Sequence, residues 1–152
     1  MTASTSSGDG ATAYAAELDA AHDRARRAYA ARDSAEYLRL FHPALEYTQL
    51  DGRTISREQL GRDVAAQLAR VDTATSEYHR HEISVGEGGE VTELVDQRAS
   101  FAVRAFGFLR REWSVRRRGR YQWLRTASGW QIRRVQILTE EVLPVSTQLS
   151  FR

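Results

Sequence analysis

Residues 110–138 of this chain decide the fold, and they read RREWSVRRRGRYQWLRTASGWQIRRVQIL. The pattern predicts a strand over Glu112 to Thr126, a tight turn at Ser128-Gly129 and a second strand from Trp130. At about 3.3 Å per residue the first strand would extend roughly 50 Å, longer than a compact domain of this size is wide. The strand must therefore curl, and Gly119 is the expected place for a bulge or bend because it lacks a Cβ.

A curled hairpin has a concave side. Strand alternation beyond Gly119 places Tyr121, Trp123 and Arg125 on one face. Across the turn, the residues that share a face are Trp130, Ile132, Arg134, Gln136 and Leu138. Aromatic side chains mixed with polar ones are typical of a small-molecule pocket. An ordinary core, whose Trp and Tyr side chains also need polar partners, fits the same pattern.

Length and composition bound the answer. The 152 residues, of which 41% are hydrophobic, suffice for one globular domain. No apolar run approaches the ~18 residues of a membrane span. The absence of Cys excludes disulfides and thiol nucleophiles and makes the cytoplasm the default compartment. Residues 1–12 lack the features of a secretory signal, and we expect them to form a disordered tail. We expect one domain over residues 13–143 and a C-terminal extension over 144–152.

The basic residues are all Arg, and both Lys and Asn are absent. This indicates codon bias in the genome rather than selection for an acidic binding partner. The chain has 22 basic and 20 acidic residues, so its net charge is only +2. The run Arg116 to Arg118 would split between the two faces of a strand rather than form one patch. We therefore do not expect nucleic-acid binding.

The residues before the long hairpin predict helices first and strands afterwards. A helix is expected from about Ala13 to Arg32, and a short second helix is capped by Asp33. A hairpin turn at Asp51-Gly52 and a capping box from Ser56 to Gln59 precede a third helix. The strands predicted after it are Ser76 to Val85 and Val91 to Phe106. This order indicates an α+β fold with helices packed on one side of a curved antiparallel meander.

The same order, together with Leu40-Phe41-His42-Pro43, Asp51-Gly52-Arg53 and Ser128-Gly129-Trp130, resembles the nuclear transport factor 2-like superfamily. The resemblance covers Tyr14 to about Val142. It implies a cone-shaped sheet wrapped around the N-terminal helices, as in SnoaL-type polyketide cyclases, ketosteroid isomerases and scytalone dehydratases. This fold hosts enzymes, binding modules and assembly subunits, so the resemblance alone does not fix the chemistry.

The ketosteroid isomerase pattern fails when it is carried across. Its carboxylate base falls at Gln49, its oxyanion-hole acid at Tyr121 and its helix tyrosine at Ala25. Only Tyr121 could still donate a hydrogen bond to an oxyanion. A second likeness, in Gly119-Arg120-Tyr121 and the segments after it, is to the β subunits of aromatic-ring dioxygenases, which are mainly structural.

Two histidines are the main candidates for chemistry. Ile83 and Val85 mark the core-facing side of their strand, and a period of two places Glu77, His79 and His81 on that side. Histidine is the usual proton carrier at neutral pH. A bulge between Tyr78 and Glu82 would instead turn the histidines to solvent and Tyr78 inward. No third distant ligand accompanies the His-x-His pair, so no metal is expected.

The remaining candidates follow from the resemblance. Tyr47 and Gln49 should face inward, as should Arg134 and Gln136. A buried Arg134 would need a carboxylate partner, either Glu77 or an anionic ligand. On the opposite face, Val135, Ile137, Leu94 and Ala102 are expected to form an apolar patch with a charged edge at Arg133. Members of this superfamily commonly pair through the outer sheet face, so a homodimer is expected.

The leading hypothesis is a cofactor-independent cyclase, dehydratase or isomerase that moves protons on a hydrophobic, oxygenated small molecule. His79 and His81 would be the acid or base, and Tyr47 and Tyr121 the oxyanion donors. The expected substrate-binding residues are Gln49, Glu77, Trp113, Trp123, Arg125, Arg134 and Gln136. The alternative is a non-catalytic module that binds a ligand or steadies a partner subunit. A third possibility is a domain whose centre is filled by side chains and that only dimerises.

Overall fold

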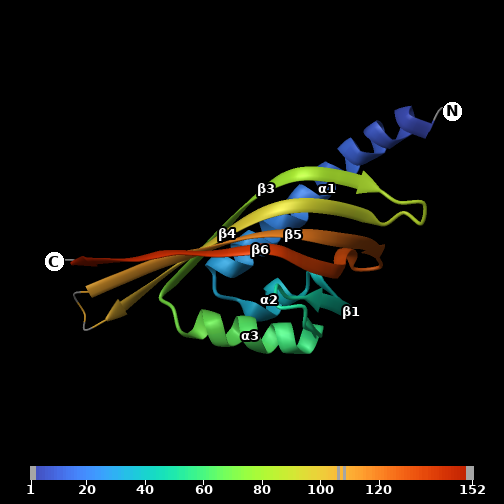
Figure 1. Ribbon diagram of the computed structural model, residues 1–152. Coiled ribbons are helices and arrows are strands. Elements are labelled where there is room, and N and C mark those ends of the chain that lie inside the picture. Colours follow the sequence, from blue (N-terminus) through green and yellow to red (C-terminus); the bar gives the residue numbers. More distant parts are fainter. Residues whose placement is uncertain (1–2, 106, 108, 150–152) are drawn as a thin grey trace.

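The computed structural model describes residues 3–105, 107 and 109–149 (Figure 1). Its helices are α1 (Ala3–Ala30), α2 (Ser34–Leu38) and α3 (Arg57–Ala69). The first two strands, β1 (Phe41–Thr48) and β2 (Thr54–Ile55), lie between α2 and α3 in the chain. The remaining strands are β3 (Thr73–Val85), β4 (Val91–Ala105), β5 (Leu109–Thr126) and β6 (Gly129–Leu149). In the described part of the chain, no helix is long and apolar enough to cross a membrane.

All the strands belong to one sheet with the order β2-β1-β6-β5-β4-β3. Strands β3 to β6 form the predicted antiparallel meander. Strand β1 lies outside this meander and pairs with β6 in parallel. A parallel pair needs a long crossover between its strands, and here α3 and the strands β3 to β5 supply it.

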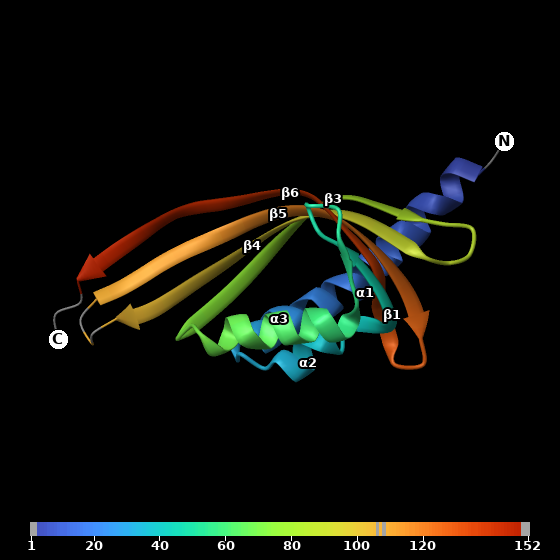
Figure 2. The same cartoon turned by 60° about the horizontal axis from the view of Figure 1, so that its bottom comes forward.

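The sheet is strongly bent, and the helices pack on its concave side (Figure 2). The pairing of β5 with β6 shifts register between Arg118 and Gly119, where the sequence predicts a bulge or bend. A Cβ atom on Gly119 would lie 3.0 Å from Cε2 of Tyr121. The glycine therefore lets the tyrosine ring lie against the strand backbone inside the bend.

Local sequence signals explain the helix boundaries. Ser56 caps α3 by accepting a hydrogen bond from the backbone N–H of Gln59, and Asp33 caps α2 in the same way. Helix α1 begins at Ala3, so residues 3–12 are helical where we expected a disordered tail. Residues 144–149, expected as an extension, continue β6. The buried apolar residues of α1 and α3 are Leu18, Ala21, Ala28, Tyr29, Leu60, Val64 and Leu68.

Candidate functional site

The inward face of β3 differs from the predicted one. Residues Ala74 to Arg80 alternate so that Ala74, Tyr78 and Arg80 are covered, whereas Glu77 and His79 are exposed. The register with β4 shifts between Arg80 and Glu82, and beyond the shift Ile83 and Val85 are again covered. The prediction that the two histidines face inward is therefore wrong, and the alternative with a bulge is confirmed. One extra residue reverses the parity of every side chain before it.

The histidines lie on the outer face in a charged cluster. Nε2 of His81 lies 2.7 Å from Oδ2 of Asp96, and Nε of Arg118 donates to Oδ1 of Asp96 at 2.8 Å. The ring of His79 lies edge-on to that of His81, with 4.8 Å between centroids. The hydrogen bonds from Arg118 and His81 hold the pKa of Asp96 far below its ordinary value. This cluster is partly exposed to solvent.

The inward face of β6 also differs from prediction. Gln122 pairs with Arg134 whereas Trp123 pairs with Ile132, so Arg133 is an extra residue in β6. As a result Val135 and Ile137 are buried, and Arg134 and Gln136 are exposed. The outer apolar patch that was to include Val135 and Ile137 is therefore absent from the described residues. The homodimer prediction consequently rests on the family resemblance alone.

Arg134 pairs with Glu46 rather than with Glu77. Nε of Arg134 lies 3.1 Å from Oε2 of Glu46, and both side chains are largely exposed. Arg125 lies over the ring of Trp130, 4.8 Å from its centroid, and pairs with Glu17 near the β5–β6 turn. Arg134 thus forms a surface ion pair, and Arg125 contacts residues at the end of the β5–β6 hairpin.

An internal cavity of about 100 Å³ lies between the helices and the concave face of the sheet. It is lined by five tyrosines from different elements, which are Tyr29, Tyr37, Tyr47, Tyr78 and Tyr121. A more open recess of about 490 Å³ adjoins it, and Tyr47 and Arg117 border both. Gln49 borders the recess, and Glu77 borders the cavity, but neither His79 nor His81 does.

His22, on α1, is the histidine that borders the cavity. Its Nε2 lies 2.9 Å from Oε1 of Glu93 on β4, and the same oxygen accepts a 2.6 Å hydrogen bond from Nε1 of Trp123. Nε of Arg80 donates to the other oxygen of Glu93 at 2.7 Å. Glu93 is fully buried, so each of its oxygens is satisfied inside the protein. Trp123, expected in the pocket wall, instead supports this carboxylate.

The ionised state of Glu93 fixes the tautomer of His22. Burial alone would raise the pKa of Glu93, but the hydrogen bonds and charges of His22 and Arg80 outweigh it and the pKa is lowered. An ionised carboxylate only accepts hydrogen bonds, so Nε2 of His22 carries the proton. In neutral His22 the lone pair is therefore on Nδ1, which has no hydrogen-bond partner among the described residues.

Aromatic contacts hold the His22 ring in place. The ring stacks on Tyr78 at 4.0 Å between centroids and meets the edge of Trp123 at 5.3 Å. The Tyr78 hydroxyl donates to Asp19 at 2.5 Å, and Arg80 also donates to Asp19 at 2.8 Å. A histidine whose ring and tautomer are fixed by a carboxylate is the usual arrangement of a general base.

The tyrosines of the cavity are neutral donors. Burial raises the pKa of Tyr29 to about 12, and burial likewise raises the pKa values of Tyr37, Tyr47 and Tyr121. The Tyr121 hydroxyl donates to Oε1 of Gln97 at 2.8 Å. Among residues 10–104, 107 and 109–143, whose side chains the structure describes, the hydroxyls of Tyr37 and Tyr47 have no hydrogen-bond partner, so they can donate to a ligand.

Our sequence predictions missed His22 and Glu93, although both carry a readable signal. His22 follows Leu18 by four residues and so lies on the apolar stripe of α1. Glu93 lies midway between Val91 and Val95, at the buried parity of β4. A charged or titratable residue on a buried face needs a partner, and these two are each other's. The described residues hold no group of three or more His, Asp or Glu side chains suited to a metal ion.

No protein-family model and no curated protein matches this sequence. Among solved structures, a nuclear transport factor 2-like superfamily protein from Salmonella enterica has a TM-score of 0.63 and 16% identity, covering 80% of this chain and 87% of its own. A protein assigned as a scytalone dehydratase from Novosphingobium aromaticivorans has a TM-score of 0.68 and 10% identity, covering 91% and 90%. A hexachlorocyclohexane dehydrochlorinase (LinA) of type 2 has a TM-score of 0.65 and 10% identity, covering 93% and 94%. These likenesses show that the chain has the nuclear transport factor 2-like fold.

Proposed function

We propose that this protein with the nuclear transport factor 2-like fold is a cofactor-independent enzyme that moves a proton on a small, largely apolar molecule carrying an oxygen atom. The observation that carries the proposal is the His22–Glu93 pair at the wall of a tyrosine-lined cavity. We assign to His22 the role of acid or base that the sequence analysis gave to His79 and His81, because His22 borders the cavity and the other two do not.

His22 is the proton acceptor, through Nδ1. Asp19 and Glu93 bring two negative charges close to the one positive charge of Arg80. A proton taken up by His22 therefore completes a balanced set of charges rather than adding an unpaired one. Glu93 acts on the substrate only through His22, so it is a positioning residue.

The oxygen of the substrate lies toward Tyr37 and Tyr47. As a proton leaves the substrate, negative charge develops on this oxygen, and neutral hydroxyl donors stabilise it. Arg117 borders the same space and adds positive charge, although Glu140 pairs with its Nε at 2.6 Å. The inner cavity takes only a small reactive group, so the rest of a larger substrate occupies the adjoining recess.

Elimination is the reaction class that we favour. Two structural neighbours are named for dehydration and dehydrochlorination, and both reactions remove a proton and a leaving group from adjacent atoms. A single base beside neutral hydroxyl donors fits this chemistry, because the donors assist the departing oxygen. Cyclisation and isomerisation begin with the same proton transfer and are tested by the same variants.

A general probe of base catalysis tests the proposal without knowledge of the substrate. 5-Nitrobenzisoxazole opens when a base removes its C3 proton, and the product absorbs visible light. We expect the wild-type protein to catalyse this reaction and His22→Ala to lose at least about 100-fold in rate. His79→Ala, which changes an exposed histidine, is the matched control and should keep the wild-type rate. Equal rates for His22→Ala and the wild type, with both folded by circular dichroism, would refute the role of His22.

A second candidate is a non-catalytic binding module, and one observation favours it. Glu93 has three protein partners, so its hydrogen bonds are all satisfied within the protein. This is expected of a network that serves to stabilise the core. This candidate predicts that hydrophobic ligands bind in the cavity with equal affinity to the wild type and to His22→Gln. It also predicts no catalysis of the probe reaction by either protein.

A further inference from the structure

We propose that a groove on the helix side of the molecule binds a doubly charged phosphate-class anion. The groove has a volume of about 480 Å³, and the residues of its wall that concern binding are Arg24, Glu36, Arg39, Arg57, Ser128 and Gln131. We call it the arginine groove. It shares only Leu40 with the inner cavity, so it is a separate site and does not depend on the proposed function.

Arg57 is a fixed cation without a counter-ion. Its Nε donates to the carbonyl of Phe41 at 2.9 Å and its Nη2 to the carbonyl of Leu38 at 3.1 Å. Both acceptors are neutral, and no carboxylate of the described chain lies within ion-pair distance of Arg57. Arg57 is also the first residue of α3, where the partial positive charge of the helix end has the same sign. An anion in the groove would meet a guanidinium that is already held in position.

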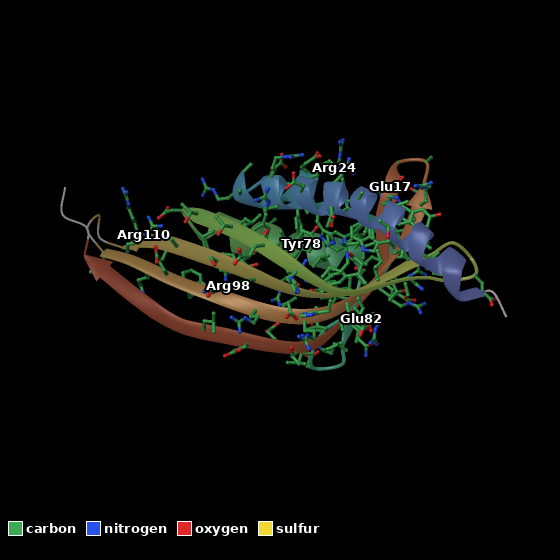
Figure 3. All side chains as sticks on the ribbon, turned by 90° about the horizontal axis from the view of Figure 1, so that it is seen from above. Glu17, Arg24, Tyr78, Glu82, Arg98 and Arg110 are labelled. Carbon is green, nitrogen blue, oxygen red and sulfur yellow. The ribbon has the colours of Figure 1, made fainter. Side chains whose placement is uncertain are left out.

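Arg24 and Arg39 bring further positive charge from other elements. Arg24 projects from the side of α1 that faces away from the sheet, and in the described chain it forms no ion pair (Figure 3). Arg39 follows α2 and lies 3.5 Å from Glu36 in an exposed pair. The wall thus holds three arginines against one carboxylate, an excess of two positive charges.

This excess favours a dianion over a monocarboxylate. Guanidinium groups match the oxygen atoms of a phosphate with paired hydrogen bonds, and three of them approach the groove from three elements. Ser128 in the β5–β6 turn and Gln131 on β6 add neutral polar groups to the same wall. Arginines elsewhere, such as Arg80 and Arg118, are paired with carboxylates of this chain. The arginine groove therefore keeps positive charge that the protein itself does not neutralise.

Isothermal titration calorimetry of the full chain tests the proposal. The probes are inorganic phosphate, pyrophosphate and glycerol 3-phosphate in a chloride buffer. We expect one site, and a dissociation constant that rises with sodium chloride concentration. Arg24→Gln and Arg39→Gln should each weaken binding by about tenfold. The probe that binds most tightly distinguishes free phosphate from a phosphate ester as the source of the ligand.

Arg27→Gln is the matched control. Arg27 lies on the same helix as Arg24 but pairs with Asp23 at 2.9 Å and does not border the groove. It should bind the probes like the wild type. The proposal is overturned if none of the three probes binds at millimolar concentration, or if Arg27→Gln weakens binding as much as Arg24→Gln. Arg57 is left unchanged because it also ties α3 to two backbone carbonyls.

Discussion

Nε2 of His22 lies 2.9 Å from Oε1 of Glu93, and neither residue is more than 5% exposed. The pair joins α1 to β4 across 71 residues of sequence. Because a buried charge without partners is costly, the contact ties the position of the first helix to that of the sheet. Stability and the proposed chemistry therefore depend on the same few side chains.

Removing the buried carboxylate should strongly destabilise the fold. Glu93→Ala leaves Arg80 short of a partner and the His22 and Trp123 N–H groups unsatisfied. We expect the free energy of unfolding to fall by about 3–5 kcal/mol. Urea denaturation followed by circular dichroism measures it. Glu77→Ala, on an exposed position of the neighbouring strand, should change it little, and a similar loss in both variants would contradict the buried network.

Acid should destabilise the wild-type protein partly through Glu93. Its pKa in the folded state is lowered from the ordinary value of 4.5, with burial opposing the shift and the partners His22 and Arg80 producing it. A lowered pKa contributes stability above the unfolded value, and this contribution is lost as the pH falls through the folded value. The free energy of unfolding should therefore decrease below pH 4.5. Glu93→Gln should show a shallower decrease in denaturant titrations at a series of pH values.

The bend in β5 should not tolerate a side chain at Gly119. A Cβ atom there would lie 3.0 Å from Cε2 of Tyr121, so Gly119→Ala must displace the ring. We expect a cost of about 1–3 kcal/mol in the free energy of unfolding. In a double-mutant cycle the cost should shrink when Tyr121→Ala is also present. Purely additive effects would show that the ring is not what the new methyl group meets.

The two arginines Arg80 and Arg134 should differ widely in importance. Arg80 is 16% exposed and binds both Glu93 and Asp19, whereas Arg134 is 58% exposed and, in the described part of the chain, pairs only with Glu46. Arg134→Ala should cost less than about 1 kcal/mol, as exposed ion pairs do. Arg80→Ala should cost several times more, because it leaves two carboxylates short of a partner. Comparable midpoints of thermal unfolding for the two variants would contradict this ranking.

The kinds of element and their turns could be predicted from the sequence because their signals are local. The structure has helix N-caps at Asp33 and Ser56 and a turn between β5 and β6, as the sequence predicted. These features depend on contacts among residues three or four apart. The parallel pairing of β1 with β6 could not be predicted in this way, because it joins residues that are distant in sequence.

The face of each strand was much harder to predict. The register shifts near His81 and at Arg133 carry no marker such as glycine, yet each reverses the side chains on one side of it. The predicted site consequently included His79 and Arg134, which are exposed. Tyr47 and Tyr121 do border the cavity, so the inward face predicted for each of them is the observed one.

The place of β6 between β1 and β5 bears on how the chain is completed during synthesis. Until β6 leaves the ribosome, β1 has only the two-residue strand β2 as a neighbour, and one edge of β5 is open. Strand β6 thus joins β1 to β5 and completes the sheet. Contacts between residues so distant in sequence form slowly. A product truncated before Gly129 would keep every helix but expose two unpaired strand edges, and it should aggregate rather than persist as a smaller domain.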